Sequence, residues 1–156
     1  LAFHLRTPEG QALPHDVRAL IAKGLGLLGT AYVRTGDTRQ GEDIFRLALQ
    51  FAGDGEAAAD IFLRLGEAML ETSRFGEAIG PLRRAMSLGA SPKVVLPMLA
   101  QAFERRERHV AAWVCLEEAA RAGVSEDALS ELRTAVEGAL GSGVEALRAH
   151  LRAQSS

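Results

Sequence analysis

The chain has 156 residues, enough for one domain, and its formal net charge at pH 7 is −2. A charge this close to neutral gives no indication of nucleic acid or an anionic membrane as a partner. Hydrophobic residues make up 47% of the chain and aromatic residues 5%, and the abundant Ala, Leu, Arg and Glu favour helix over sheet. The single cysteine, Cys115, cannot form an internal disulfide, so nothing indicates an oxidising compartment.

No apolar run approaches the roughly 18 to 20 residues that a membrane span needs, so we expect no span. The first residue is Leu1 rather than Met. We therefore expect a fragment of a longer protein, with any targeting peptide outside the sequence. The expected location is the cytoplasm.

Residues 1–14 do not follow a helical pattern. Apolar and other residues alternate around Leu1, Phe3 and Leu5, and Pro8 and Pro14 would interrupt any helix. We expect this segment to form an extended N-terminal arm.

The first expected helix runs from about residue 16 to residue 34. Its apolar residues recur at steps of three and four, the pattern of one buried helical face. They are Val17, Leu20, Ile21, Leu25, Leu28 and Tyr32. Gly29 is expected to let a partner helix approach closely, because it has no side chain.

The partner helix is expected to end at about residue 52, with Asp37 as its N-cap and Gly53 as its stop signal. Two further pairs are expected, at about residues 56–72 and 74–88 and at about residues 92–106 and 109–122. Pro92 suits the first position of a helix, whereas Pro81 and Pro97 lie inside helices and predict bends. Helices over 125–140 and 144–153 follow, with Ser125 and Ser142 as N-terminal signals.

A repeat organises the three pairs. The pattern Leu28-Gly29-x-x-Tyr32 returns 37 residues later as Leu65-Gly66-x-x-Met69 and, after a further 34 residues, as Leu99-Ala100-x-x-Phe103. Downstream positions move with it, so that Gly41, Ala78 and Ala112 fall into one column. A repeat of this length is typical of stacked helical pairs.

This spacing resembles the tetratricopeptide repeat family, whose 34-residue unit reads W-x2-L-G-x2-Y and then A-x3-F. The resemblance implies an all-α fold, a right-handed α-solenoid of helix-turn-helix pairs. Three repeats would cover residues 15–126, at about 22–55, 59–92 and 93–126. Residues 127–156 would supply a C-terminal capping helix and a short final helix.

Catalytic chemistry is not indicated. The four histidines, His4, His15, His109 and His150, show no metal-ligand spacing, and no catalytic or phosphate-binding motif is present. We therefore expect no enzyme, no cofactor and no metal site. Cys115 is expected to be a small core residue rather than a reactive thiol.

Trp113 follows inward-facing Ala112 by one residue. We expect it to lie wedged at the edge of the core, with display as a binding anchor as the alternative.

The resemblance further implies which side chains line a concave, partner-binding groove. They are Leu27, Thr30, Val33, Arg34, Leu63, Arg64, Glu67, Leu70, Val94, Pro97, Met98, Gln101 and Arg105. One subclass of the family grips a terminal carboxylate with Lys, Asn and Arg, but the matching positions here hold Gly26, Thr30, Arg64, Val94 and Met98. An apolar floor with a charged rim is expected instead.

The leading hypothesis is a non-catalytic protein-interaction module that binds an apolar helical or extended segment of a partner protein. An alternative is a chaperone similar to those that hold translocator proteins in type III secretion. A third is a structural domain that self-associates through its end helices or through Trp113. Cover of the groove by the N-terminal arm or the last helix is a further possibility within all three.

Overall fold

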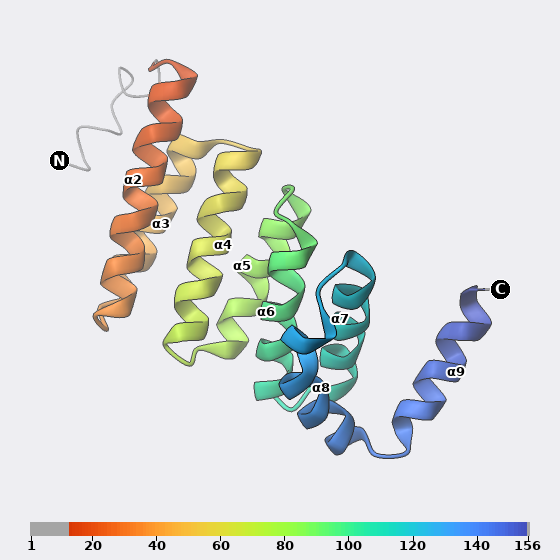
Figure 1. Cartoon of the computed structure of the whole chain (residues 1–156). Coiled ribbons are helices and arrows are strands. Elements are labelled where there is room, and N and C mark those ends of the chain that lie inside the picture. The colour runs from red at the N-terminus through yellow and green to blue at the C-terminus, as the bar shows by residue number, and fades with distance from the viewer. Residues whose placement is uncertain (1–12, 156) are drawn as a thin grey trace. The chain divides into compact units, whose positions relative to one another are not determined.

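The computed structural model describes residues 13–155, and of the expected arm over 1–14 it therefore includes only Leu13 and Pro14. Within the described range the chain forms eight α-helices and no strand, which confirms the predicted all-α class (Figure 1). None of these helices is long and apolar enough to cross a membrane. The chain divides after Ser91 into two compact units, which are described in turn.

The first unit contains two helical pairs. Its helices are α2 (His15–Arg34), α3 (Thr38–Ala52), α4 (Glu56–Glu71) and α5 (Phe75–Ser87). α2 packs on α3 and α4 packs on α5, and both helices of the first pair also contact α4. All four lie within two residues of the bounds that the sequence predicts.

Local signals explain these bounds. The Asp37 carboxylate accepts a hydrogen bond from the Gln40 backbone N–H at 3.2 Å, so it satisfies one of the free donors at the start of α3. Gly53 follows α3 with a φ of 68°, a left-handed conformation that glycine adopts at little cost. The predicted cap and stop signal are both confirmed.

Small residues bring the paired helices together. A Cβ at Gly29 would lie 3.0 Å from Phe45 Cδ2, and a Cβ at Gly66 would lie 2.6 Å from Leu82 Cγ. These glycines occupy the same position in successive copies of the repeat, one in α2 and one in α4. The expectation that Gly29 permits a close approach is confirmed.

The buried face of α2 is not the one predicted. Its buried residues are Ala22, Gly26, Gly29, Thr30 and Val33. Leu20 and Leu28 are 70% and 46% exposed, and Val17 is also exposed. The prediction that these three side chains face inward is wrong, because α3 and α4 pack against the side of α2 where small residues allow close contact. Ile21 and Leu25 are half-buried and do pack against the core.

The second unit consists of α6 (Pro92–Arg105), α7 (His109–Ala122), α8 (Glu126–Leu140) and α9 (Gly143–Ser155). α6, α7 and α8 contact one another, and α9 contacts α8. Ser125 caps α8 by accepting a hydrogen bond from the Ala128 N–H at 3.3 Å. Gly123 ends α7 in the left-handed conformation, with a φ of 104°.

Pro81 and Pro97 lie inside α5 and α6, as the sequence indicates. Both helices continue through them, and the expected bends stay predictions. The core of the second unit includes Leu116, Leu129 and the fully buried Trp113. Trp113 is therefore a packing residue and not a displayed anchor.

Candidate binding surface

The α2 and α4 helices lie side by side and form one face of the first unit (Figure 1). A Cβ at Gly26 would lie 3.6 Å from Ile61 Cγ1 and 3.7 Å from Arg64 Cδ, so Gly26 faces α4. The Thr30 hydroxyl donates to the Gly26 carbonyl at 2.9 Å and is buried. The predicted groove residue Thr30 is thus turned back onto its own helix.

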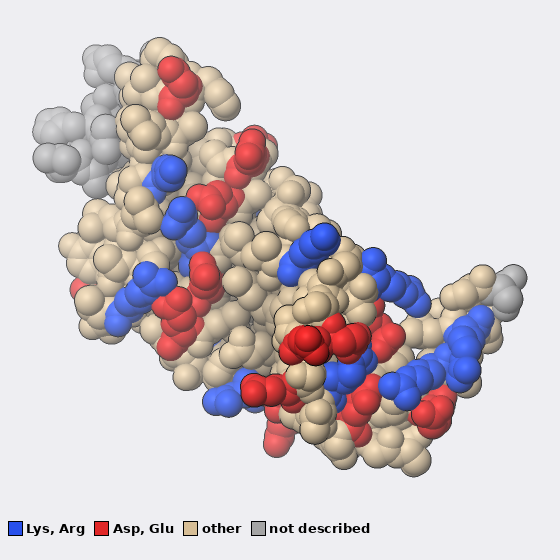
Figure 2. Space-filling view, in the orientation of Figure 1, with Lys and Arg blue, Asp and Glu red and all other residues tan. Residues whose placement is uncertain are grey.

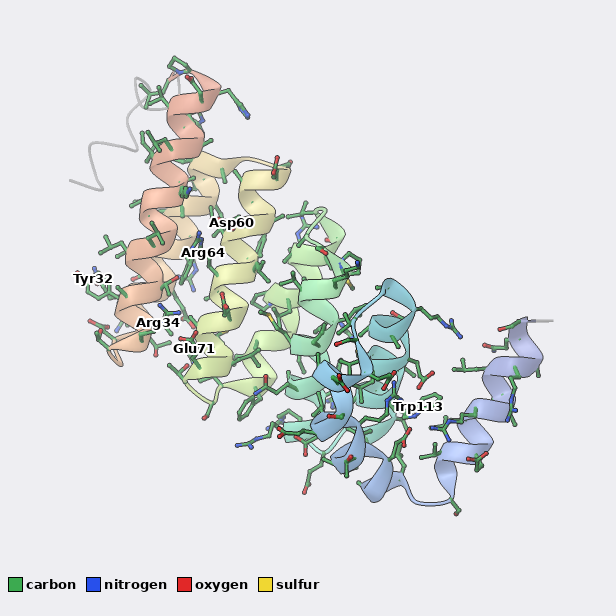
Figure 3. The ribbon with its side chains drawn as sticks, in the orientation of Figure 1. Tyr32, Arg34, Asp60, Arg64, Glu71 and Trp113 are labelled. Atoms are coloured by element: carbon green, nitrogen blue, oxygen red, sulfur yellow. The ribbon has the colours of Figure 1, made fainter. Side chains whose placement is uncertain are left out.

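Arg34, which the resemblance places in the groove, forms an ion pair with Glu71 between the C-terminal ends of α2 and α4 (Figure 3). Two hydrogen bonds join them, Nε to Oε2 at 2.5 Å and Nη2 to Oε1 at 2.9 Å. The hydrogen bond to Glu71 raises the pKa of Arg34, and the same bond lowers the pKa of Glu71. The planar guanidinium fixes the carboxylate in two directions, which aligns the two helix ends.

Arg64, on α4, points along its own helix toward Asp60. Its Nε donates to Asp60 Oδ2 at 3.0 Å, an interaction between side chains one turn apart. Glu67 lies exposed on the same helix. Figure 2 shows charges of both signs interspersed over α2 and α4.

The apolar floor expected here is smaller than predicted. Leu27 is 50% exposed and Leu63 is half-buried, so both offer surface to a partner. Val33 is fully buried and Leu70 is nearly so. Together with Thr30, these two pack inside the unit, and their assignment to the groove is wrong. The position of a residue in its helix predicts which side of the helix it lies on, but the packing of neighbouring helices decides whether its side chain is exposed.

The remaining predicted groove residues lie on α6 in the second unit. Val94 is 44% exposed, Pro97 and Met98 are half-buried, and Gln101 and Arg105 are exposed. All five reach the surface of α6.

A recess of about 340 Å³ opens where α2 begins and α3 leads into α4. His15 and Lys23 line it from α2, and Asp54, Glu56 and Asp60 line it from the α3–α4 loop and α4. Sequence reasoning missed this recess, because its walls are brought together only by the packing of three segments. No group of three or more His, Cys, Asp or Glu in the described part of the chain is placed to hold a metal ion.

A second polar cluster lies in the second unit, centred on Glu137 of α8. Its Oε1 accepts hydrogen bonds from Trp113 Nε1 at 3.3 Å, Arg133 Nη1 at 3.4 Å and Arg148 Nη2 at 2.8 Å. The donors come from α7, α8 and α9. This one carboxylate therefore joins three helices.

Arg133 is the most enclosed cation of that cluster, with 16% of its side chain exposed. Burial alone would lower the pKa of Arg133, but hydrogen bonds to Glu117 and Glu126 outweigh burial and raise the pKa. The bond to Glu117 Oε1 is 2.7 Å long and crosses from α8 to α7. Part of this cluster could have been predicted from the sequence, because Arg133 and Glu137 are opposite charges four residues apart on one helix.

Beside this cluster, a cleft of about 440 Å³ separates α7 from α9. Trp113 and Leu151 line it together with three arginines, Arg121, Arg148 and Arg152. Glu117 and Glu145 also contribute to its walls, so the cleft carries both signs of charge.

The residues considered for catalysis lie on different helices. His15 is on α2, His109 on α7 and His150 on α9, and His4 falls outside the described residues. His150 Nε2 lies 3.1 Å from Gln154 Nε2 on the same helix. Cys115 is half-buried, so it is less enclosed than the expected core residue.

Searches against models of protein families, curated proteins and solved structures find no match to this chain.

Proposed function

We propose that the protein is a non-catalytic interaction module, built from repeats of the tetratricopeptide type, that binds a segment of another protein on the α2–α4 face. The three helical pairs α2–α3, α4–α5 and α6–α7 coincide with the three copies of the sequence pattern, which supports the repeat assignment. The surface of α6 around Val94 and Met98 is a second contact area within the same proposal.

The observation that carries the proposal is the position of Leu27. This side chain is 50% exposed on a face where four charged side chains form the pairs Arg34–Glu71 and Arg64–Asp60. Those pairs reduce the number of unmatched charges that a partner must neutralise. A partner segment with an apolar side chain over Leu27 and Leu63, flanked by polar residues, fits this surface.

Selection from a displayed library of random peptides tests the proposal, followed by fluorescence anisotropy with each selected peptide. Leu27→Glu is the informative variant, because the fold tolerates a charge at a half-exposed position. The substitution is expected to weaken binding at least about tenfold, since a central apolar contact contributes about 2 kcal/mol or more on truncation.

Val110→Glu is the matched control. Val110 is 51% exposed, close to the exposure of Leu27, but it lies on α7 in the second unit. Peptides that bind this variant and Leu27→Glu with equal affinity would contradict the proposal, as would a library that yields no binder for the wild-type chain.

A further inference from the structure

An apolar stripe runs along α2 on the side opposite its buried residues. Leu20 is 70% exposed, Leu28 46% and Val17 38%, and Ala31 is also exposed. A Cβ built on Gly24, in the middle of this stripe, would meet nothing within 4 Å. Helical geometry places residues at these spacings on one face, and the stripe contains no charged residue.

The same face is buried on the next repeat. The 37-residue offset aligns Gly24 with Ile61, and Ala31 with Ala68. On α4 these two positions are 1% and 0% exposed, and they belong to the core cluster that includes residues of α2 and α3. This helical face therefore packs against other helices wherever a neighbour is present, and on α2 it has no helical neighbour among the described residues.

The stripe is also symmetric about Gly24. Leu20 and Leu28 stand four residues before and after it, and Val17 and Ala31 stand seven residues before and after it. A second α2 lying antiparallel across Gly24 would place Leu20 of one copy opposite Leu28 of the other. Gly24 would let the two backbones approach at the crossing point, because it has no side chain.

We propose that two copies of this chain associate through antiparallel packing of their α2 helices, with the two-fold axis beside Gly24. A 20-residue helix is about 30 Å long, so two of them bury an area at the low end of specific interfaces. The dimer is accordingly weak, with a dissociation constant on the order of micromolar. Its interface lies on the stripe and leaves Leu27 and Arg34 on the flank.

Sedimentation equilibrium over a range of protein concentrations measures this association. The wild-type chain is expected to shift from monomer to dimer as concentration rises. Gly24→Arg is expected to raise the dissociation constant at least about tenfold, because a long charged side chain would occupy the crossing point. Helix content by circular dichroism should not fall, since arginine favours helix more than glycine does.

Gly138→Arg is the matched control. Gly138 is also an exposed helical glycine with nothing within 4 Å of a built Cβ, but it lies on α8. This variant is expected to dimerise like the wild type.

Disulfide trapping locates the axis. In a Cys115→Ala background, Gly24→Cys is expected to give a covalent dimer on mild oxidation, whereas Gly138→Cys is not. A wild-type chain that stays monomeric at every concentration overturns the proposal. The stripe would then be a contact surface for residues 1–12 or for a different protein. A dimer that persists unchanged in Gly24→Arg overturns it as well.

Discussion

The indole Nε1 of Trp113 donates a hydrogen bond to Oε1 of Glu137 at 3.3 Å, and this bond links the core of the second unit to its most enclosed charges. Trp113 is fully buried, so its N–H depends on a hydrogen-bond partner within the protein. The same oxygen also accepts hydrogen bonds from two arginines. The Glu137 carboxylate therefore accepts hydrogen bonds both from a tryptophan in the core and from two arginines near the surface.

Replacement of Glu137 by Ala is expected to lower the free energy of unfolding by about 1–3 kcal/mol, because a buried donor is left without its acceptor. Urea denaturation followed by fluorescence of Trp113 measures the change, since the chain has one tryptophan. Glu131→Ala, at an exposed position on the same helix, should change stability by no more than about 0.5 kcal/mol. Equal effects of the two substitutions would show that the hydrogen bond to Trp113 contributes nothing.

The two arginines of this cluster, Arg133 and Arg148, are expected to contribute differently to the free energy of unfolding. Arg133 is 16% exposed and contacts three carboxylates, so Arg133→Ala should cost about 1–3 kcal/mol. Arg148 is 40% exposed, and solvent weakens its contacts, so Arg148→Ala should cost less than about 1 kcal/mol. The same denaturation assay compares them. A larger loss in Arg148→Ala would mean that α9 stabilises the unit more than its contacts indicate.

The Arg34–Glu71 pair predicts a specific dependence on pH. The pKa of Glu71 is lowered in the folded chain, so its contribution to stability is present above about pH 4.5, the ordinary value for this group. That contribution is lost as the pH falls through the lowered value. Both side chains are well exposed, and the effect on stability is therefore small.

An NMR titration of the Glu71 side chain tests this directly. The midpoint is expected below 4.5 in the wild type and closer to 4.5 in Arg34→Gln. A midpoint that does not move in this variant would show that Arg34 is not the cause of the lowered pKa.

The close packing of α4 and α5 predicts that Gly66 does not tolerate a methyl group. A Cβ there would lie 2.6 Å from both Cγ and Cδ2 of Leu82, which is itself fully buried. Gly66→Ala is expected to destabilise the first unit by about 1–3 kcal/mol, despite the better helix propensity of alanine. Thermal denaturation followed by circular dichroism measures the loss.

Gly24→Ala supplies the contrast for that experiment, because its Cβ would lie in open space on another helix of the same unit. This variant should gain stability, by up to about 1 kcal/mol. A loss of stability in Gly24→Ala comparable to that in Gly66→Ala would show that the short contact to Leu82 is not the cause of the loss at Gly66.

Local chemistry made the helix bounds predictable from the sequence. Asp37 and Ser125 accept hydrogen bonds from backbone N–H groups three residues ahead, and these caps act within one turn. The close approaches at Gly29 and Gly66 were also predictable, because the repeat places both at one position. For the binding surface, the family resemblance implied Leu27 and Arg34 as groove residues, and both are exposed on α2.

What periodicity could not provide was the side from which each neighbour approaches. Val33 and Leu20 are both apolar residues of α2, but the first is fully buried and the second is 70% exposed. Only the positions of α3 and α4 distinguish them. The Glu137 cluster was missed for a similar reason. Arg148 is 11 residues and Trp113 is 24 residues from Glu137 along the chain, and only the packing of three helices brings them together.

The three extra residues between the first two repeats, Gly53, Asp54 and Gly55, have a consequence for how the chain can be altered. Both glycines adopt positive φ, 68° and 122°, so the backbone reverses outside the helices. The three added residues therefore lie in the loop, outside both α3 and α4. The length of this loop can therefore change without changing the residues that pack the helices together. A peptide tag inserted after Asp54 should leave the neighbouring helices intact.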